Sequence, residues 1–337
     1  MKKIIISILI LLGYGFMFGG EVTKTGTTAA NFLKLGVGAR SVAMGGAYVA
    51  VTEDISALYW NPAGLTGITS GQFLFDHMDY FADINFNYFG VAYNVPGMGV
   101  FGASVTSFDY GDMERTTEFD PEGTGELFSA AEYAGQISFA RQITDKFSIG
   151  FNAKYIYQGI WHSSAKGFAL DIGTLYKTGF NGMKIGMAIT NFGTKMQMSG
   201  KDLLVQTDIA PDISGNNETI NAYLATDKFD LPLTFRVGIA MDVLQQEKQS
   251  LILALDALHP NDNAESVNLG FEYNYDNMVF IRGGYENYLL KDSPRGFSVG
   301  FGFSPKLFGN APIQFDYAYQ KWDYFDNIQK FSLVATF

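Results

Sequence analysis

The feature that most constrains the fold of this chain is an alternation of apolar and polar residues that recurs from about residue 70 onward. In residues 231–244, apolar side chains occupy every second position from Leu233 to Val243. The same alternation is clear in residues 146–158 and 264–275. Successive side chains of a β-strand point to opposite faces, so this period indicates strands with one apolar and one polar face.

Fourteen segments carry this pattern between turn residues. We expect strands at about 71–78, 85–94, 98–108, 131–142, 146–158, 166–177, 183–192, 231–244, 249–258, 264–275, 277–287, 295–303, 311–321 and 327–337. An even number of antiparallel strands is typical of single-chain barrels of the bacterial outer membrane.

The connections between these strands support a barrel. One alternate set is short: Asn94–Gly97, Gln142–Lys146, Thr178–Gly182, Gln245–Lys248, Asp276 and Ser304–Asn310. The other set includes two long polar segments, Asp109–Ala130 and Gly193–Asp230. Outer-membrane barrels have short periplasmic turns and longer extracellular loops, whereas a soluble sandwich gives no reason for this difference. The sequence therefore predicts an all-β fold, a 14-stranded antiparallel transmembrane β-barrel.

The composition agrees with this class. Of 337 residues, 15% are aromatic and only 17% are charged, below the ~25% charged residues of typical soluble domains. The mean hydropathy of +0.05 is too low for a bundle of membrane helices. The net charge of −11 argues against nucleic acid as a partner. The absence of cysteine excludes disulfides, thiolate metal sites and a cysteine nucleophile.

The longest uncharged stretch, Ile84–Phe108, would be long enough to cross a membrane as a helix. However, Pro96 and Gly97 form a turn signal between two alternating runs, so a strand, a turn and a second strand explain it better. We expect no membrane helix in the mature chain.

Both ends of the chain suit an exported barrel. Two lysines, an apolar run over 4–12 and small residues at Gly19 and Gly20 indicate a signal peptide, residues 1–20, cut near Gly20. An N-terminal membrane anchor is the less favoured alternative, because no basic stop-transfer flank follows. The final segment, Phe331–Phe337, alternates and ends on an aromatic residue, as outer-membrane barrels do. We therefore expect Sec-dependent export to the bacterial outer membrane.

Residues 21–69 break the strand pattern because glycines interrupt them. A short helix is expected at Asp54–Trp60, ending before Pro62. Since glycine permits close backbone approach, we expect this N-terminal segment to fold inside the lumen as a plug, with residues 70–337 forming the barrel.

The polar face of the strands carries charges of both signs that would face the lumen: Lys154, Asp171, Arg236, Asp242, Asp256, Glu272, Arg282 and Asp316. Charges in a confined interior must be paired or hydrated. They could form a structural network that braces the barrel against the plug, or line a selective path for a solute; the sequence leaves both open.

The N-terminal segment also carries a family resemblance. Its pattern resembles the signature shared by FadL-like barrels and the PorV/PorQ family, and it includes Gly38, Arg40, Met44, Gly45, Gly46, Asp54, Trp60, Asn61, Pro62 and Gly64. Trp60 before Asn-Pro-Ala favours PorV/PorQ. The C-terminal half resembles the same family at Leu255–Asn263, Asn268–Tyr273, Ile281–Tyr285 and Asp316–Tyr319.

The resemblance implies a FadL-like outer-membrane barrel with a role in type IX secretion. PorV-type members carry cargo with a C-terminal β-sandwich signal domain to a surface attachment complex, and PorQ-type members help to build the attachment machinery. Neither role needs catalysis. The implied partners are outer-membrane lipid, secretion-system proteins and cargo. The alternative is a FadL-like channel for hydrophobic small molecules, with an apolar pocket near the plug, an opening through the wall and a lipid or detergent molecule in the lumen.

A carrier of this kind would contact cargo through its extracellular loops, so we expect partner binding on Asp109–Ala130 and Gly193–Asp230. The candidate binding residues of the first loop are mostly acidic and favour a basic partner surface: Asp112, Glu114, Arg115, Glu118, Asp120 and Glu122.

No enzyme site stands out. Ser163–Lys166 matches S-x-x-K without its companion motifs, and no nucleophile–base pair is evident. Asp120–Gly123 and Pro260–Asn263 offer oxygens but lack EF-hand spacing. We therefore expect no catalytic residues, no metal and no cofactor.

Overall fold

The computed structural model describes residues 24–215, 219–290, 293–305, 312–323 and 326–337. The expected signal peptide with its cleavage near Gly20, and most of the connection Ser304–Asn310, lie outside the described residues. Within the described ranges, no helix combines the length and the apolar composition that crossing a membrane requires.

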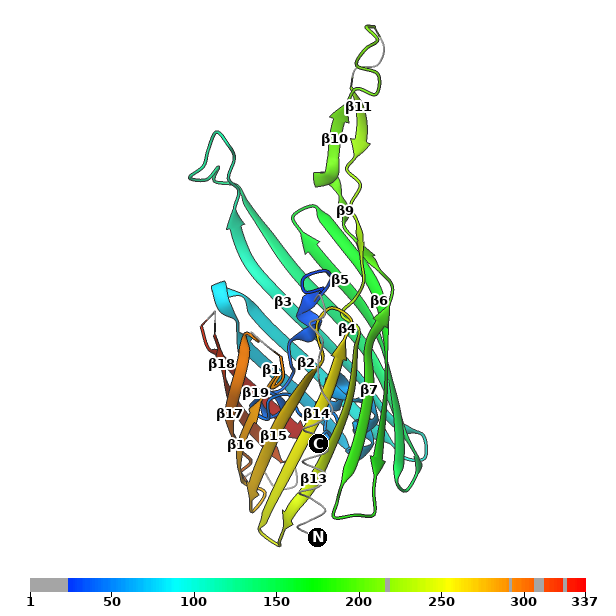
Figure 1. Ribbon diagram of the computed structural model, residues 1–337, viewed down its shortest axis with the longest axis vertical. Coiled ribbons are helices and arrows are strands. Elements are labelled where there is room, and N and C mark those ends of the chain that lie inside the picture. Colours follow the sequence, from blue (N-terminus) through cyan, green and yellow to red (C-terminus); the bar gives the residue numbers. More distant parts are fainter. Residues whose placement is uncertain (1–23, 216–218, 291–292, 306–311, 324–325) are drawn as a thin grey trace.

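Fourteen long strands form one closed antiparallel sheet (Figure 1). They are β1 (Gly71–Asp79), β2 (Asn85–Val95), β3 (Gly99–Glu114), β4 (Leu127–Thr144), β5 (Phe147–Ile160), β6 (Ser163–Lys177), β7 (Lys184–Gly193), β13 (Thr234–Gln245), β14 (Gln249–Pro260), β15 (Ser266–Tyr275), β16 (Val279–Tyr285), β17 (Arg295–Phe303), β18 (Ile313–Trp322) and β19 (Ile328–Thr336). Each strand pairs with its neighbours in this order, and β1 pairs with β19 to close the ring. The predicted 14-stranded barrel is confirmed.

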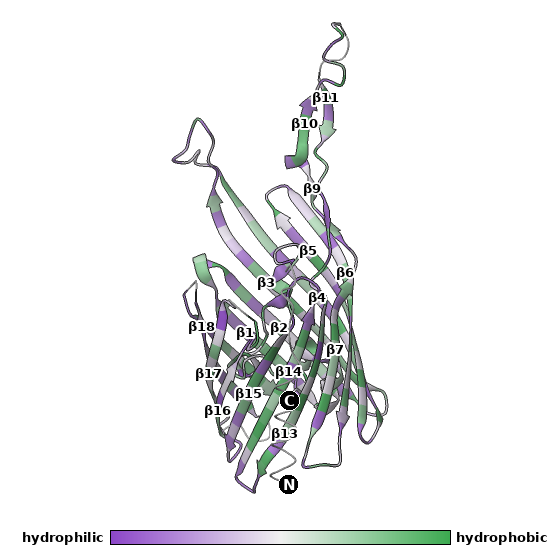
Figure 2. Cartoon of the chain, viewed as in Figure 1, coloured by the Kyte–Doolittle hydropathy of each residue, from purple (hydrophilic) through white to green (hydrophobic). Residues whose placement is uncertain are grey.

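Hydrophobic and hydrophilic bands follow one another along the strands (Figure 2), and side-chain burial shows that this alternation separates the two faces of the wall. In β13, Phe235, Ile239 and Val243 are exposed on the outer face, whereas Thr234 and Gly238 are buried on the inner face. A barrel in lipid needs this arrangement, because apolar side chains must contact hydrocarbon while polar side chains are kept in the interior.

The two rims of the barrel differ. One, the short-turn rim, carries the tight connections such as that between β2 and β3; the other, the long-loop rim, carries the β3–β4 and β7–β13 connections (Figure 1). The predicted start and end of the first loop were wrong: past a bulge between Asp109 and Asp112, β3 continues to Glu114 and β4 begins at Leu127. These strand ends mix exposed polar residues such as Asp112, Glu114 and Ser129 with apolar ones, so they lack the regular alternation that lipid imposes.

The β7–β13 connection has secondary structure of its own. It contains β8 (Met196–Gln197), β9 (Ser199–Gly200), the 3-10 helix η4 (Lys201–Leu203), β10 (Leu204–Thr207), β11 (Ile220–Tyr223) and β12 (Lys228–Phe229). The pair β10–β11 projects away from the barrel (Figure 1).

The N-terminal segment from residue 24 to 70 lies inside the barrel (Figure 1). It contains the short helices η1 (Asn31–Lys34), α2 (Ala39–Ala43), α3 (Ala57–Trp60) and η2 (Pro62–Gly67), while η3 (Phe81–Asp83) lies between β1 and β2.

The expected helix at Asp54–Trp60 is shorter than predicted and begins at Ala57. The Asp54 carboxylate accepts a hydrogen bond from the backbone N–H of Ser56 at 2.9 Å. Asp54 therefore lies in a turn that precedes the helix and is not its first residue. The helix ends at Trp60, because Asn61 precedes Pro62 and is extended, with φ −163°.

Glycines on the inner wall let this segment lie directly against the strands. We call them the glycine belt: Gly150, Gly173, Gly186, Gly238, Gly270, Gly284 and Gly300. A Cβ at Gly284 would lie 2.2 Å from the backbone nitrogen of Gly45, and one at Gly186 would lie 2.3 Å from the carbonyl oxygen of Val49. Only glycine allows backbone contact this close.

Replacing a belt glycine therefore should loosen the segment. We expect Gly284→Ala to destabilise the folded barrel by about 1–3 kcal/mol, the usual cost of forcing an extra methyl into a packed interior. The urea midpoint of unfolding in lipid vesicles measures this. Gly135→Ala in β4 is the matched control, since a Cβ there meets no atom within 4 Å. Equal midpoints for the two variants would contradict the close contact.

Candidate functional site

Two carboxylates of the wall bind the backbone of the N-terminal segment. Oδ2 of Asp256 accepts hydrogen bonds from the N–H groups of Tyr48 at 2.7 Å and Val49 at 2.9 Å. Oδ2 of Asp76 accepts one from Gly38 at 3.0 Å. Both carboxylates are fully buried. Irregular backbone in a buried lumen has unpaired N–H groups, and these inward-facing side chains supply the acceptors.

A series of charged side chains of alternating sign, which we call the charge chain, connects the segment to β15, β16 and β18. Arg40 donates two hydrogen bonds of 2.7 Å to Glu272 and one of 2.7 Å to Asp54. Arg282 bonds Glu272 at 2.5 Å and Asp316 at 2.6 Å. The Arg40–Glu272 pair is bidentate, so it fixes both the distance between the two side chains and their relative orientation. The structure thus brings together three predicted lumen residues and joins them to two residues of the family signature.

The other predicted lumen charges are not part of the charge chain. Lys154 pairs with Asp171 at 2.7 Å as a separate buried pair between β5 and β6. Arg236 lies over the ring of Trp60, at 4.9 Å from its centroid. Asp242 lies beside Gly182 near the short-turn rim and forms no ion pair within the described ranges. The predicted charges therefore form separate groups instead of one network.

Sequence reasoning missed two charged contacts of the segment. Lys330 pairs with Asp76 at 2.9 Å and donates a hydrogen bond to the carbonyl of Gly36. Glu53 pairs with Lys177 at 2.6 Å and with Lys184. Asp76 and Lys330 do occupy inward positions of the alternation, so the period that identified the strands could also have placed these two charges in the lumen.

The signature residues of the N-terminal segment are all buried or half-buried. The indole N–H of Trp60 donates to the carbonyl of Val37 at 2.8 Å. The amide of Asn61 donates to the carbonyls of Val49 at 2.9 Å and Thr174 at 3.0 Å, which ties the segment to β6. The remaining positions make close turns or contacts: Met44 is fully buried, Gly45 and Gly46 have φ of 64° and 69°, Pro62 begins η2, and a Cβ at Gly64 would lie 2.3 Å from Thr52.

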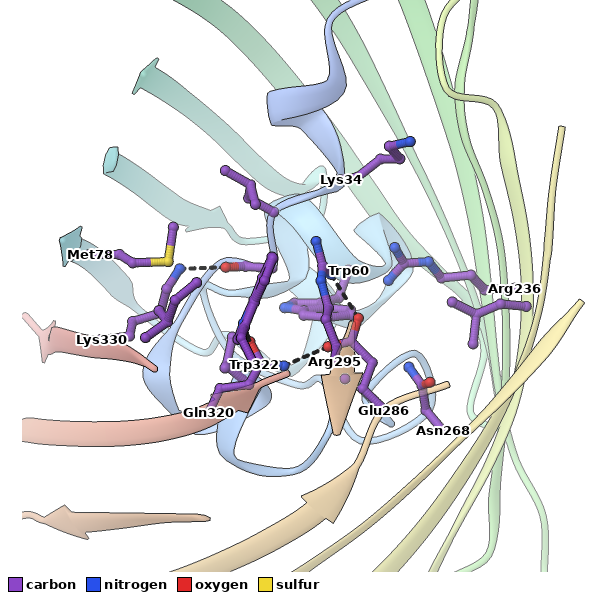
Figure 3. Close-up of a pocket in the computed structure, with 16 residues that line it drawn as sticks. Lys34, Trp60, Met78, Arg236, Asn268, Glu286, Arg295, Gln320, Trp322 and Lys330 are labelled. Carbon is purple, nitrogen blue, oxygen red and sulfur yellow. Dashed lines mark hydrogen bonds and ion pairs between the residues drawn. The ribbon is translucent and has the colours of Figure 1, made fainter. Parts of the chain in front are cut away.

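The cavities described inside the barrel are small, and their linings combine charged and apolar side chains. One cavity, of about 40 Å³, lies between the segment and the wall and is lined by several charged side chains (Figure 3). A second, of about 160 Å³, is lined by Arg40, Asp54 and Asp316 among others. A third lumenal cavity, of about 20 Å³, is lined mostly by apolar side chains such as Phe32, Leu33 and Phe86, and it is far smaller than the ~300–1,000 Å³ of a typical ligand pocket. An apolar hollow of about 580 Å³ lies instead against outward residues such as Phe89, Ile137 and Phe168.

The predicted partner-binding residues lie at the long-loop rim. Asp112 and Glu114 are on the end of β3, whereas Arg115, Glu118, Asp120 and Glu122 lie in the β3–β4 loop, and all are exposed. The loop is closed by a 2.7 Å ion pair between Arg115 and Glu126. Phe119 at its tip is 91% exposed.

The β7–β13 connection is attached to the same rim by Asp202. Its carboxylate accepts hydrogen bonds from the backbone N–H of His162 at 3.0 Å and the hydroxyl of Ser163 at 2.9 Å, and it contacts the His162 ring at 3.0 Å. Burial acts to raise the pKa of Asp202, but the hydrogen bonds from His162 and Ser163 outweigh it and hold the pKa below its ordinary value. Beyond this attachment, Leu204, Ile209, Ile213, Tyr223 and Leu224 are exposed.

The charge chain yields a stability prediction. Arg40→Gln leaves Asp54 and Glu272 with too few cationic partners, and we expect a loss of about 2–4 kcal/mol, somewhat below a fully buried pair because Arg40 is partly exposed. Urea unfolding in lipid vesicles measures it. Arg115→Gln breaks an exposed pair and should cost about 0–1 kcal/mol. Similar losses for both variants would argue against the chain as a structural element.

A family model described as "Type IX secretion system protein PorV" matches residues 20–213. A UPF0164 protein of Treponema pallidum (strain Nichols) is 30% identical over 186 residues, which cover 49% of this chain and 44% of that protein. The chain thus matches less than half the length of this curated relative.

Solved structures share the fold. The CymD monoaromatic hydrocarbon channel superposes with a TM-score of 0.57 at 14% identity, over 90% of this chain and 98% of that chain. The Pseudomonas putida toluene transporter TodX gives 0.56 at 15%, over 89% and 97%. A Pseudomonas aeruginosa FadL homologue gives 0.51 at 13%, over 89% and 98%. At these identities the likeness shows the barrel fold alone.

Proposed function

The chain belongs to the PorV family of type IX secretion system proteins, and from this we propose that it is a non-enzymatic cargo carrier. It binds secreted proteins at the long-loop rim, which faces the outside of the cell, and delivers them to a surface attachment complex. Short turns on the periplasmic side and long loops on the outer side are the usual orientation of such barrels.

The proposal rests on one observation: the lumen is occupied, whereas the long-loop rim is exposed. The N-terminal segment occupies the lumen and is bound to the wall on several sides through Asp76, Asp256 and Glu272. On the long-loop rim, the two projections carry exposed side chains such as Phe119 and Tyr223 that a partner at the cell surface could reach. In this proposal the segment is a plug, and the barrel is a membrane anchor that presents the rim.

The chemistry of the rim suggests the kind of partner surface. The β3–β4 loop combines acidic side chains, such as Glu118 and Glu122, with the exposed ring of Phe119. A buried aromatic anchor with complementary charge around it is a common arrangement at protein interfaces. We propose that the cargo's C-terminal β-sandwich domain presents a basic surface with an apolar pocket to this loop.

The runner-up function is uptake of hydrophobic small molecules, which the barrel fold of the hydrocarbon channels favours. Such a channel needs an apolar path wide enough for its ligand, whereas the lumenal cavities described above are small, at about 20, 40 and 160 Å³, against the ~300–1,000 Å³ of a typical ligand pocket. The small size of these cavities therefore favours the carrier.

Loop replacement tests the carrier proposal. We expect replacement of residues 116–125, or of residues 204–224, by a short Gly-Ser linker to weaken binding of the cargo signal domain. The double replacement should weaken binding about tenfold or more, because the anchor residues of both loops are lost. Affinity capture from detergent-solubilised membranes measures this. Replacement of the short turn 246–248 is the control.

Unchanged capture by the double replacement would refute the proposed binding loops. Co-purification of lipid with no protein partner would favour transport instead.

A further inference from the structure

The apolar hollow of about 580 Å³ lies on the outer face of the wall, over strands that stand next to one another from β2 to β6 (Figure 1). The outward side chains of these strands form rows across the wall. One row that lines the hollow consists of Val105, Gly135, Tyr155 and Phe168, in register on β3, β4, β5 and β6. A Cβ at Gly135 would meet no atom within 4 Å. The hollow is therefore a gap in the outer layer of side chains.

This gap does not pass through the wall. Both neighbours of β4 pair with it in unbroken register through Gly135. On the inner side, the amide of Gln136 donates to the carbonyl of Leu58 in the N-terminal segment at 2.8 Å, and Lys154 pairs with Asp171 at 2.7 Å. A molecule in the hollow is thus in contact with the membrane and separated from the lumen.

The next row toward the long-loop rim has the composition of a membrane interface. It consists of Ser107, Tyr133, Tyr157 and Lys166, again in register. The rings of Tyr133 and Tyr157 are stacked, with their centroids 6.4 Å apart. Outer-membrane barrels carry such aromatic residues where the apolar band meets the headgroups. We therefore place the hollow in the hydrocarbon region, directly next to this interface.

Lys166 is the charged member of the interface row. Its side chain is exposed and has no ion-pair partner among the residues that the structure describes. Apolar contact alone does not select one lipid over another, because lipid tails are as apolar as the wall. A hollow that gives a tail more van der Waals contacts, together with a cation at headgroup level, supplies selectivity through shape and charge.

From this arrangement we propose that the hollow binds one acyl chain of an anionic membrane lipid whose phosphate pairs with Lys166. The chain lies over Gly135, and the phosphate lies beside the two stacked tyrosines. The site is on the outer wall, so it is independent of the cargo-binding loops and of the proposed carrier function.

Native mass spectrometry of the intact protein, released from detergent, resolves individual bound lipids and tests the proposal. Phosphatidylglycerol, which is anionic, is compared with phosphatidylcholine of the same acyl chains, which has no net charge. We expect the first phosphatidylglycerol to bind about fivefold more tightly than the first phosphatidylcholine, because a lysine near the membrane surface favours an anionic lipid by about this factor.

Two variants separate the contributions of charge and shape. Lys166→Gln should abolish the preference for phosphatidylglycerol, whereas Lys248→Gln at the short-turn rim should keep it. Gly135→Leu fills the hollow and should weaken the binding of both lipids about fivefold or more, since the tail loses its contacts. Val299→Leu, at an exposed outward position of β17, is the matched control.

Equal affinity of the wild-type protein for the two lipids would overturn the proposal. An unchanged preference in folded Lys166→Gln, or an unchanged first lipid in folded Gly135→Leu, would do the same. A wild-type dimer that Gly135→Leu dissociates would also overturn it, because a second copy would then occupy the hollow. The comparison of the two lipids uses the wild-type protein, so misfolding of a variant leaves the test intact.

Discussion

The structure depends on how a barrel wall satisfies the hydrogen-bonding groups of an irregular segment enclosed within it. A buried N–H without a partner is costly, and residues 24–70 contain only short helices. The wall supplies the missing acceptors from inward positions of its strands, as Asp256 does for Tyr48 and Val49 and Asp76 does for Gly38. Lipid on the outer face enforces the alternation that directs these side chains inward.

Close packing and charge pairing act together on the segment. The glycine belt brings strand and segment backbones into contact, and the chain from Asp54 through Arg40 and Glu272 fixes the segment against β15 and its neighbours. The cavities described in the lumen are small. In the proposed function, the filled interior distinguishes this barrel from a pore, and the groups that bind a partner lie on the long-loop rim.

The sequence predicted the strands well and the contacts between distant residues poorly. Lipid imposes the period on every membrane-crossing strand, so segments such as 146–158 could be found within a few residues of their observed ends. Beyond the membrane that constraint ends, which is why the extension of β3 to Glu114 and the short strands β10 and β11 were missed. The signature identified Arg40 as a site residue, but nothing local indicates its partner Glu272, 232 positions away.

The central claim is that the native barrel is occluded by its N-terminal segment, and ion conductance across a planar lipid bilayer tests it most directly. The account predicts that the purified wild-type protein, once inserted, gives no steady conductance, and that Asp76→Asn combined with Asp256→Asn, which weakens the acceptors for the segment, gives intermittent openings. A stable open-channel conductance from the wild-type protein would contradict the account.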